Sequence, residues 1–285
     1  MGSSRALFAA AALVIGANWG AAAADLLPPA PPIMAPPPPA ADFGGWYLRG
    51  DVGVGIQQIS DLRSTFNPTV VVPAPLFNQY SIGDAAFIGG GVGYQFNSWL
   101  RADVTGEYRT AANYRATQSY TNLWNNLCGG AIGGRCHDVY NGQHRAAVFL
   151  ANGYADLGTW FGVTPYIGGG VGVAVNFLDN VTDFGPETGG FGYARDRSQA
   201  NFAWAAMAGL GYNVSENLKL ELGYRYLDLG RVKTDVIGCP AGCAGERQSF
   251  DLASHDIRLG FRYLLAGPVA SPVMMAPPGP LIRKY

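Results

Sequence analysis

The chain has 285 residues and a formal net charge of −1, and this near-neutral balance excludes the basic surface of a nucleic-acid-binding protein. Charged residues make up only 14% and aromatic residues 12%, and 40 residues are glycine, which is typical of a membrane or surface protein. After the N-terminus no apolar run reaches the roughly 18 residues of a membrane-spanning helix, so helical spans are excluded as well.

Residues 1–24 have the three parts of a secretory signal peptide. Arg5 supplies the positive charge, residues 6–16 are apolar but too short to cross a membrane, and a run of small residues ends at Ala24. We therefore expect export of the chain and cleavage after Ala24.

Proline-rich segments flank the rest of the chain, a linker at residues 25–41 and a C-terminal tail at residues 266–285. Proline cannot donate to a β-ladder, so both segments are expected to be extended or disordered. They act either as plain spacers, which their composition favours, or as tethers for a periplasmic partner. The domain between them, residues 42–265, is long enough for one β-domain.

Eight segments of this domain alternate between apolar and polar side chains with the period of a β-strand. They span residues 46–57, 85–96, 99–110, 144–157, 164–177, 201–214, 218–229 and 255–263. In the last one, Ile257, Leu259 and Phe261 share one face while charged residues and glycine occupy the other. An apolar outer face, a polar inner face and an even strand number are features of bacterial membrane barrels. The sequence predicts an all-β fold, an eight-stranded antiparallel transmembrane β-barrel.

The segment at 144–157 is ambiguous. Asn152 and Asp156 favour the inner face, and the same alternation sends Val148 and Leu150 inward with them. A β-bulge at a position that the sequence does not define would separate the two pairs.

The connections between the segments alternate in length. Tight turns are expected at 96–99, 158–160 and 213–217, and long loops at 59–83, 111–143, 178–200 and 231–253. Short periplasmic turns and long outer loops are typical of outer-membrane barrels, and both termini then lie on the periplasmic side. Aromatic residues gather at both ends of the strands and form two girdles: Trp46, Phe96, Trp99, Trp160, Phe161, Tyr212 and Tyr263 at the periplasmic end, and Tyr108, Phe177, Phe202 and Trp204 at the outer end.

The charged side chains on the inner faces indicate whether the lumen is an open pore or is filled by side chains. The positive ones are Arg49, Arg101, Arg109, Lys219, Arg225, Arg258 and Arg262, and the negative ones are Asp51, Asp103, Glu107, Asp156, Glu221 and Asp256. The two signs nearly balance, and an eight-stranded barrel is just wide enough for side chains to fill. Buried charges must pair, so we predict a salt-bridged interior with at most a narrow, occluded water path.

Four cysteines are expected to form two local disulfides in an oxidising compartment. Cys128 and Cys136 lie in one predicted loop, and Cys239 and Cys243 lie in another. Cys239 and Cys243 have neither the spacing of a redox motif nor the histidine partners of a zinc site, although His137 adjoins Cys136. No metal or other cofactor is expected.

The strand Thr164-Pro165-Tyr166-Ile167-Gly168-Gly169-Gly170-Val171-Gly172 and the strand Leu222-Gly223-Tyr224-Arg225-Tyr226 carry a resemblance to a known family. Together with the Ala24-Asp25-Leu26 start they resemble the small outer-membrane β-barrels of Gram-negative bacteria, the OmpA-like barrels and opacity-protein-like surface antigens of the porin family, in their α-proteobacterial form. This resemblance implies surroundings of outer-membrane lipid and lipopolysaccharide, insertion by the outer-membrane assembly machinery, and periplasmic or host-surface partners that the sequence does not name.

The function predicted is a structural or surface-antigen role in the cell envelope, and the alternative is a low-conductance channel for small solutes. A soluble lipocalin-like binder is disfavoured because such a barrel needs an apolar lumen. A lipid A-modifying enzyme is disfavoured because Ser254 and His255 point to opposite faces, and His137 and His144 lie elsewhere. We expect no catalysis.

Overall fold

The computed structural model describes residues 44–65, 76–122, 128, 133–239 and 245–265. Ten strands account for most of them: β1 (Gly45–Ser64), β2 (Leu76–Ile82), β3 (Ala85–Gln95), β4 (Leu100–Asn122), β5 (Gly134–Asp156), β6 (Val163–Gly185), β7 (Gly190–Tyr193), β8 (Arg197–Asn213), β9 (Leu218–Lys233) and β10 (Gln248–Leu264). Within these ranges no helix is long and apolar enough to cross a membrane. The predicted signal peptide, linker and C-terminal tail lie outside the described residues.

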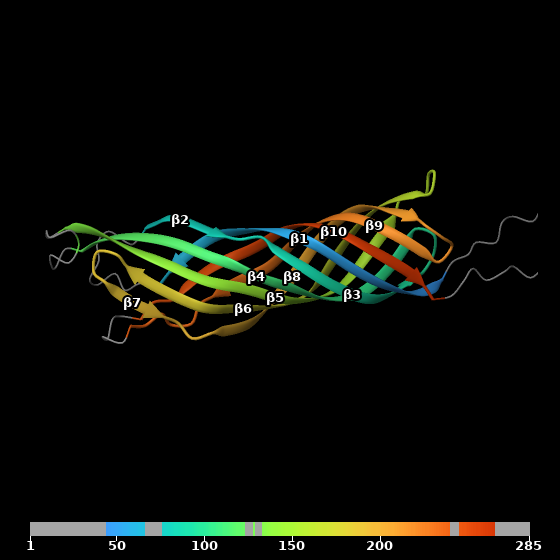
Figure 1. Cartoon of the computed structure of the whole chain (residues 1–285). Coiled ribbons are helices and arrows are strands. Elements are labelled where there is room, and N and C mark those ends of the chain that lie inside the picture. Colours follow the sequence, from blue (N-terminus) through green and yellow to red (C-terminus); the bar gives the residue numbers. More distant parts are fainter. Residues whose placement is uncertain (1–43, 66–75, 123–127, 129–132, 240–244, 266–285) are drawn as a thin grey trace, which may run out of the picture. The chain divides into compact units, whose positions relative to one another are not determined.

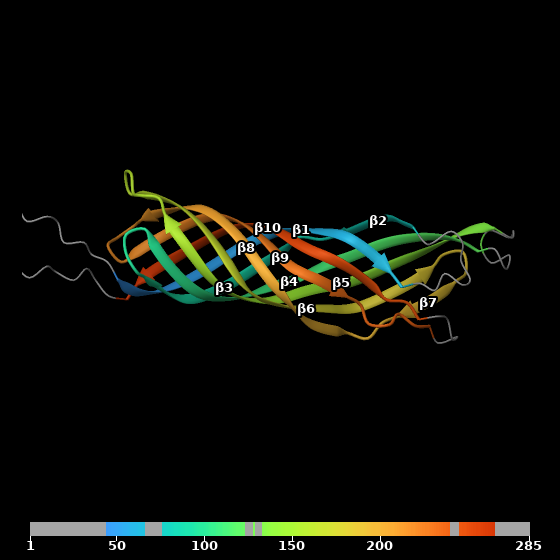
Figure 2. The same ribbon diagram turned by 180° about the vertical axis from the view of Figure 1, so that it is seen from behind.

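Eight of the strands close into a ring. The order β3-β1-β10-β9-β8-β6-β5 is joined at its ends through β4, which pairs with both β3 and β5. All of these pairings are antiparallel, and the prediction of an eight-stranded barrel is confirmed. Figures 1 and 2 show the tilted strands from two sides, with the tight turns β3–β4, β5–β6 and β8–β9 at one end and β2 and β7 at the other.

The outer connections are long, but the bounds of the loops were predicted wrongly, because strands occupy much of their length. β4, β5 and β6 have 23 residues each, and the short strands β2 and β7 pair with the far ends of β4 and β6. Register shifts in the ladders interrupt the strict alternation of inward and outward residues, so the alternation in the sequence does not show that these strands continue. Between Arg109 and Ala112 the β4 register shifts, so the inward positions change from odd to even residue numbers.

The ambiguity at 144–157 is resolved without a bulge in that stretch. The β5–β6 ladder runs unbroken from His144 to Asp156, and Val148 and Leu150 point inward with 1% and 2% exposure. Both residues belong to the buried apolar cluster, although Val148 is the ladder neighbour of Glu107, so the barrel interior is not polar throughout.

Strands of 23 residues are about twice as long as the roughly 9–11 residues that cross a bilayer. The outward side chains show where lipid contact ends: they change from Ile56 to Gln58 along β1 and from Ala147 to Arg145 along β5. We call residues 45–57, 85–109, 146–178, 201–227 and 254–264 the membrane part. The remaining described residues form the outer part.

The two parts have opposite polarity. In the membrane part the outward side chains are apolar and the inward ones are largely charged. In the outer part the outward positions of β4 carry Asn113 and Arg115, while Tyr114 and Ala116, which alternate with them, are buried inside. The interior there is an apolar cluster to which Leu229, Val232, Phe250 and Leu252 also contribute, as in a soluble β-barrel.

Candidate functional site

The charged lumen of the membrane part is the candidate site. All thirteen predicted charged residues lie on inward faces, and eleven of them are buried, the half-buried ones being Glu107 and Lys219. Alternation on single strands places them there, and the closure of the ring brings them together.

Asp256 on β10 is the centre of the upper group. Its carboxylate lies 2.6 Å from an Nη atom of both Arg109 and Arg225, and the Ser254 hydroxyl donates to it at 2.6 Å. Glu107 contacts the same two guanidinium groups at 3.1 and 2.7 Å. Two cations and two anions therefore balance each other, each with direct partners, as buried charges require.

Glu221 on β9 is the centre of the lower group. Its carboxylate oxygens lie 3.3 Å from both Arg101 and Arg262 and 3.6 Å from Arg49. Asp156 at the end of β5 adds a second acceptor for Arg101 at 3.1 Å. Loss of Glu221 would leave three buried arginines short of one anion.

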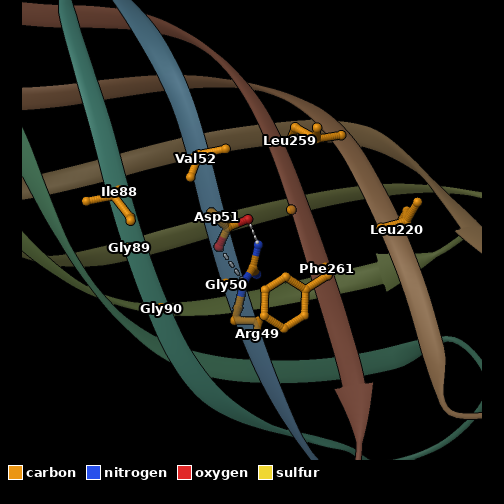
Figure 3. Close-up of a pocket in the computed structure, with 11 residues that line it drawn as sticks. Arg49, Gly50, Asp51, Val52, Ile88, Gly89, Gly90, Leu220, Leu259 and Phe261 are labelled. Atoms are coloured by element: carbon orange, nitrogen blue, oxygen red, sulfur yellow. Dashed lines mark hydrogen bonds and ion pairs between the residues drawn. The ribbon is translucent and has the colours of Figure 1, made fainter.

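Arg49 on β1 ties the lower group to the wall. It donates two hydrogen bonds of 2.8 Å to Asp51, and its Nη1 lies 2.7 Å from both Asp103 and the Tyr154 hydroxyl. Asn152 donates to the other oxygen of Asp103 at 2.8 Å. The bidentate Arg49–Asp51 pair appears in Figure 3.

Tyrosine rings fill the space between the charges. The guanidinium of Arg101 lies over the rings of Tyr154 and Tyr166, 4.1 and 4.8 Å from their centroids. Arg258 reaches only the Tyr166 hydroxyl, at 3.4 Å, and no carboxylate of the described residues lies within 4 Å of it. Glycine leaves the room that these large groups need, since a Cβ at Gly55 would clash with Arg109 and Asp256.

On the lipid side of the same wall, Gly50 and Gly90 leave a shallow hollow. It is rimmed by apolar side chains that include Val52, Ile88 and Leu259 (Figure 3). The ring of Phe261 packs against the backbone of Gly50, because a Cβ there would come within 2.6 Å of the ring. Arg49 and Asp51 also line the hollow, but their charged groups point into the lumen and pair with each other there.

The histidines do not assemble a catalytic centre among the described residues. His144 points inward and bonds Asn176 at 2.9 Å, whereas His255 points outward and lies 2.6 Å from the Tyr224 hydroxyl. His137 contacts Glu187 at 2.7 Å in the outer part. The described residues also contain no group of three His, Cys, Asp or Glu side chains that could hold a metal ion.

The cysteines lie in the outer part. Cys128 and Cys136 form a buried disulfide, and Cys136 stands on β5 rather than in a loop. Cys239 is disulfide-bonded as well, but Cys243 lies outside the described residues, so the second pairing stays a prediction.

Sequence analysis missed a second group of polar residues, inside the outer part. Asp138, Asp183 and Glu246 converge there with Tyr140 and Gln118. The signal was present: Asp138 and Tyr140 alternate with outward residues along a segment that we had expected to be a loop.

A family model for the outer membrane protein beta-barrel domain matches residues 9–263, almost the whole chain. The chain belongs to this family. An uncharacterized protein of Brucella abortus is 33% identical over 249 residues, which cover 77% of this chain and 84% of the relative. The outer membrane protein PagN of Salmonella typhimurium is 28% identical, covering 77% and 89%. A putative adhesin of Rickettsia prowazekii is 22% identical, covering 76% and 86%.

Membership of the outer membrane protein beta-barrel family places the barrel in the outer membrane. The apolar outward belt of the membrane part lies in outer-membrane lipid and lipopolysaccharide, and the role of the chain is at the cell envelope and surface. The short turns are periplasmic in this family, so the outer part lies on the cell-surface side. Most rings of the predicted girdles are exposed, with Trp46, Trp99 and Tyr263 at the periplasmic end and Tyr108 and Phe202 at the outer end, whereas Phe177 is half-buried.

Proposed function

We propose that the protein is a closed barrel that displays its outer part at the cell surface, and that it is not a solute channel. The observation that carries the proposal is a set of ion pairs that cross the lumen. β4 and β9 lie four strands apart in either direction around the ring of eight, so they face each other. Arg101 on β4 meets Glu221 on β9, and Glu107 on β4 meets Arg225 on β9.

These bridges occupy the middle of the lumen at two levels. Their side chains are buried, between 0% and 8% exposed, and each also bonds to wall residues that hold it in place. A wide water column does not fit beside them, because an eight-stranded interior holds little more than its own side chains.

The apolar layer above the charges adds a second barrier. Tyr114, Leu229 and Leu252 are buried there, on the outer side of Arg109, Arg225 and Asp256 along β4, β9 and β10. An ion that passed the arginines would have to lose its hydration shell there, as at a hydrophobic constriction.

The surface role draws support from the length of the outer part and from the relatives. Its outward side chains are polar and face water at a height that lipid does not reach. One relative carries the name of a putative adhesin, which supports contact of this outer part with a host surface. A non-catalytic role is supported by the separation of His137, His144 and His255.

Single-channel recording in a planar bilayer tests the proposal. We expect the refolded full chain to insert, as shown by a shift between boiled and unboiled gel samples, and to give no resolved conductance steps. The control is the same preparation with a porin added, which must conduct. Steady, reproducible steps from the chain alone would contradict the closed barrel and favour the channel alternative.

A further inference from the structure

Three carboxyl groups from different segments meet inside the outer part. Asp138 stands on β5, Asp183 on β6, and Glu246 in the segment that precedes β10. Tyr140 connects them: it is the ladder neighbour of Asp183, and its hydroxyl lies 2.9 Å from Glu246. Asp138 and Glu246 are only 7% and 3% exposed.

The groups that face this cluster are hydroxyls, amides and one further acid. They are Ser64 of β1, Tyr114, Gln118 and Tyr120 of β4, Tyr140 of β5, Glu187 of the β6–β7 turn, and Gln248 of β10. Ser64 donates to Glu246 at 2.5 Å, and Gln118 is the ladder neighbour of Asp138.

No arginine or lysine of the described residues lies within 4 Å of Asp138, Asp183 or Glu246. Arg247, which follows Glu246 in sequence, is occupied elsewhere, and so is Arg197. Arg247 and Arg197 pair with Asp235 at 3.6 and 3.8 Å. His137 points outward and contacts Glu187 rather than the cluster. This arrangement is the reverse of the lumen below, where every buried carboxylate has an arginine.

Buried carboxylates without a cation are stable only when they carry protons. Burial and the repulsion from Asp183 and Glu246 raise the pKa of Asp138 to about 7. Burial and Glu246 raise the pKa of Asp183 to about 7, and burial raises the pKa of Glu246. The unfolded values of such groups lie near 4, so neutral pH falls within the titration of the folded cluster.

We propose that Asp138, Asp183 and Glu246 form a proton-dependent clasp that holds β5, β6 and the segment before β10 together in the outer part. With protons bound, the three groups are neutral and stay buried, and Glu246 accepts hydrogen bonds from Ser64 and Tyr140. Loss of the protons puts like charges into one buried space, and their repulsion loosens the outer part while the arginine-paired membrane part keeps its structure.

The sign of the effect follows from the raised pKa values. A carboxyl whose pKa is higher in the folded state than in the unfolded state stabilises the folded state fully below the unfolded pKa. That contribution is lost as the pH rises from about 4 through about 7. Acidic pH therefore stabilises the folded outer part, and mildly alkaline pH destabilises it. The clasp adds regulation to the proposed surface role but can be tested in purified protein, independently of conductance or display.

Hydrogen exchange of the refolded full chain in detergent micelles tests the clasp between pH 5 and 8.5, after correction for the intrinsic pH dependence of exchange. We expect opening of the outer strand ends, such as residues 134–142 and 181–185, to increase at least about tenfold, because one unit of pKa shift corresponds to a factor of ten. Exchange in the membrane part is expected to stay constant.

The triple variant Asp138→Asn, Asp183→Asn and Glu246→Gln removes all three charges with little change of size, so its opening should be independent of pH. The matched control is Asp251→Asn, which removes an acid on the outward face of β10 that pairs with Arg231 and should keep the wild-type profile. A flat wild-type profile, or a triple variant that keeps the step, would overturn the proposal. Carboxyl carbon NMR of wild type gives a second measurement, and it would overturn the clasp if every aspartate titrated below pH 5.

Discussion

The membrane part and the outer part share one β-ladder but have contrasting interiors. In the membrane part, arginines and carboxylates fill the lumen and pair at 2.6–3.6 Å around Asp256 and Glu221. In the outer part, the interior is made of tyrosine and aliphatic side chains, and its carboxylates have no basic partner among the described residues.

The difference shows that the surroundings of the barrel determine its interior. Where lipid covers the wall, outward positions must be apolar, and the polar residues of an alternating strand are left for the inside, where they need partners. Where water covers the wall, polar residues satisfy the outside, and burial of apolar side chains inside becomes the stabilising contribution. The same two-residue period therefore carries opposite polarity in the two parts.

The largest expected effect comes from breaking an ion pair in the membrane part. Asp256→Asn removes the anion shared by Arg109 and Arg225, both of which are buried. Loss of one partner of a buried ion pair costs about 3–5 kcal/mol, because the other charge stays buried without compensation. Denaturant unfolding in lipid vesicles should show this loss.

The control for that variant is Asp251→Asn on the outward face of the same strand. Its partner Arg231 is exposed and also bonds Asp61, so the stability should stay close to that of wild type. Equal losses for the two variants would mean that the lumen pairs do not differ from surface pairs.

A smaller effect is expected from placing a charge on the outward face at two heights. Leu222→Arg puts a cation into lipid at the level of the lower ion pairs and should cost about 2–4 kcal/mol of insertion stability. Val236→Arg, also outward but in the outer part, should change stability by no more than about 0.5 kcal/mol, because the new charge meets water. Refolding into vesicles measures both, and a similar penalty at both positions would place the outer part in the bilayer.

The sequence predicted the membrane part well because lipid enforces strict alternation there. The facing of Leu222 and Glu221 on β9, for example, follows from period two alone. It could not predict which charges pair, since Arg101 and Glu221 meet across the whole ring and not between neighbouring strands. The carboxyl cluster was missed because Asp138 and Asp183 fall in segments that we expected to be loops.

The outer strands were missed for a different physical reason. The register shift after Arg109 changes the parity of β4, and the polarity reverses at nearly the same height. A search for lipid-type alternation therefore stops at this point, although Tyr114 and Ala116 continue an inward face of the soluble type.

The reversal of polarity along β4 can be measured directly with nitroxide labels on single introduced cysteines. Val104 and Asn113 both point outward, on either side of the register shift. The label at Val104→Cys should collide with oxygen, which concentrates in lipid, and be shielded from a water-soluble nickel chelate. The label at Asn113→Cys should show the opposite. Oxygen-dominated collisions at both positions would contradict the account, because lipid would then continue along a face that we place in water.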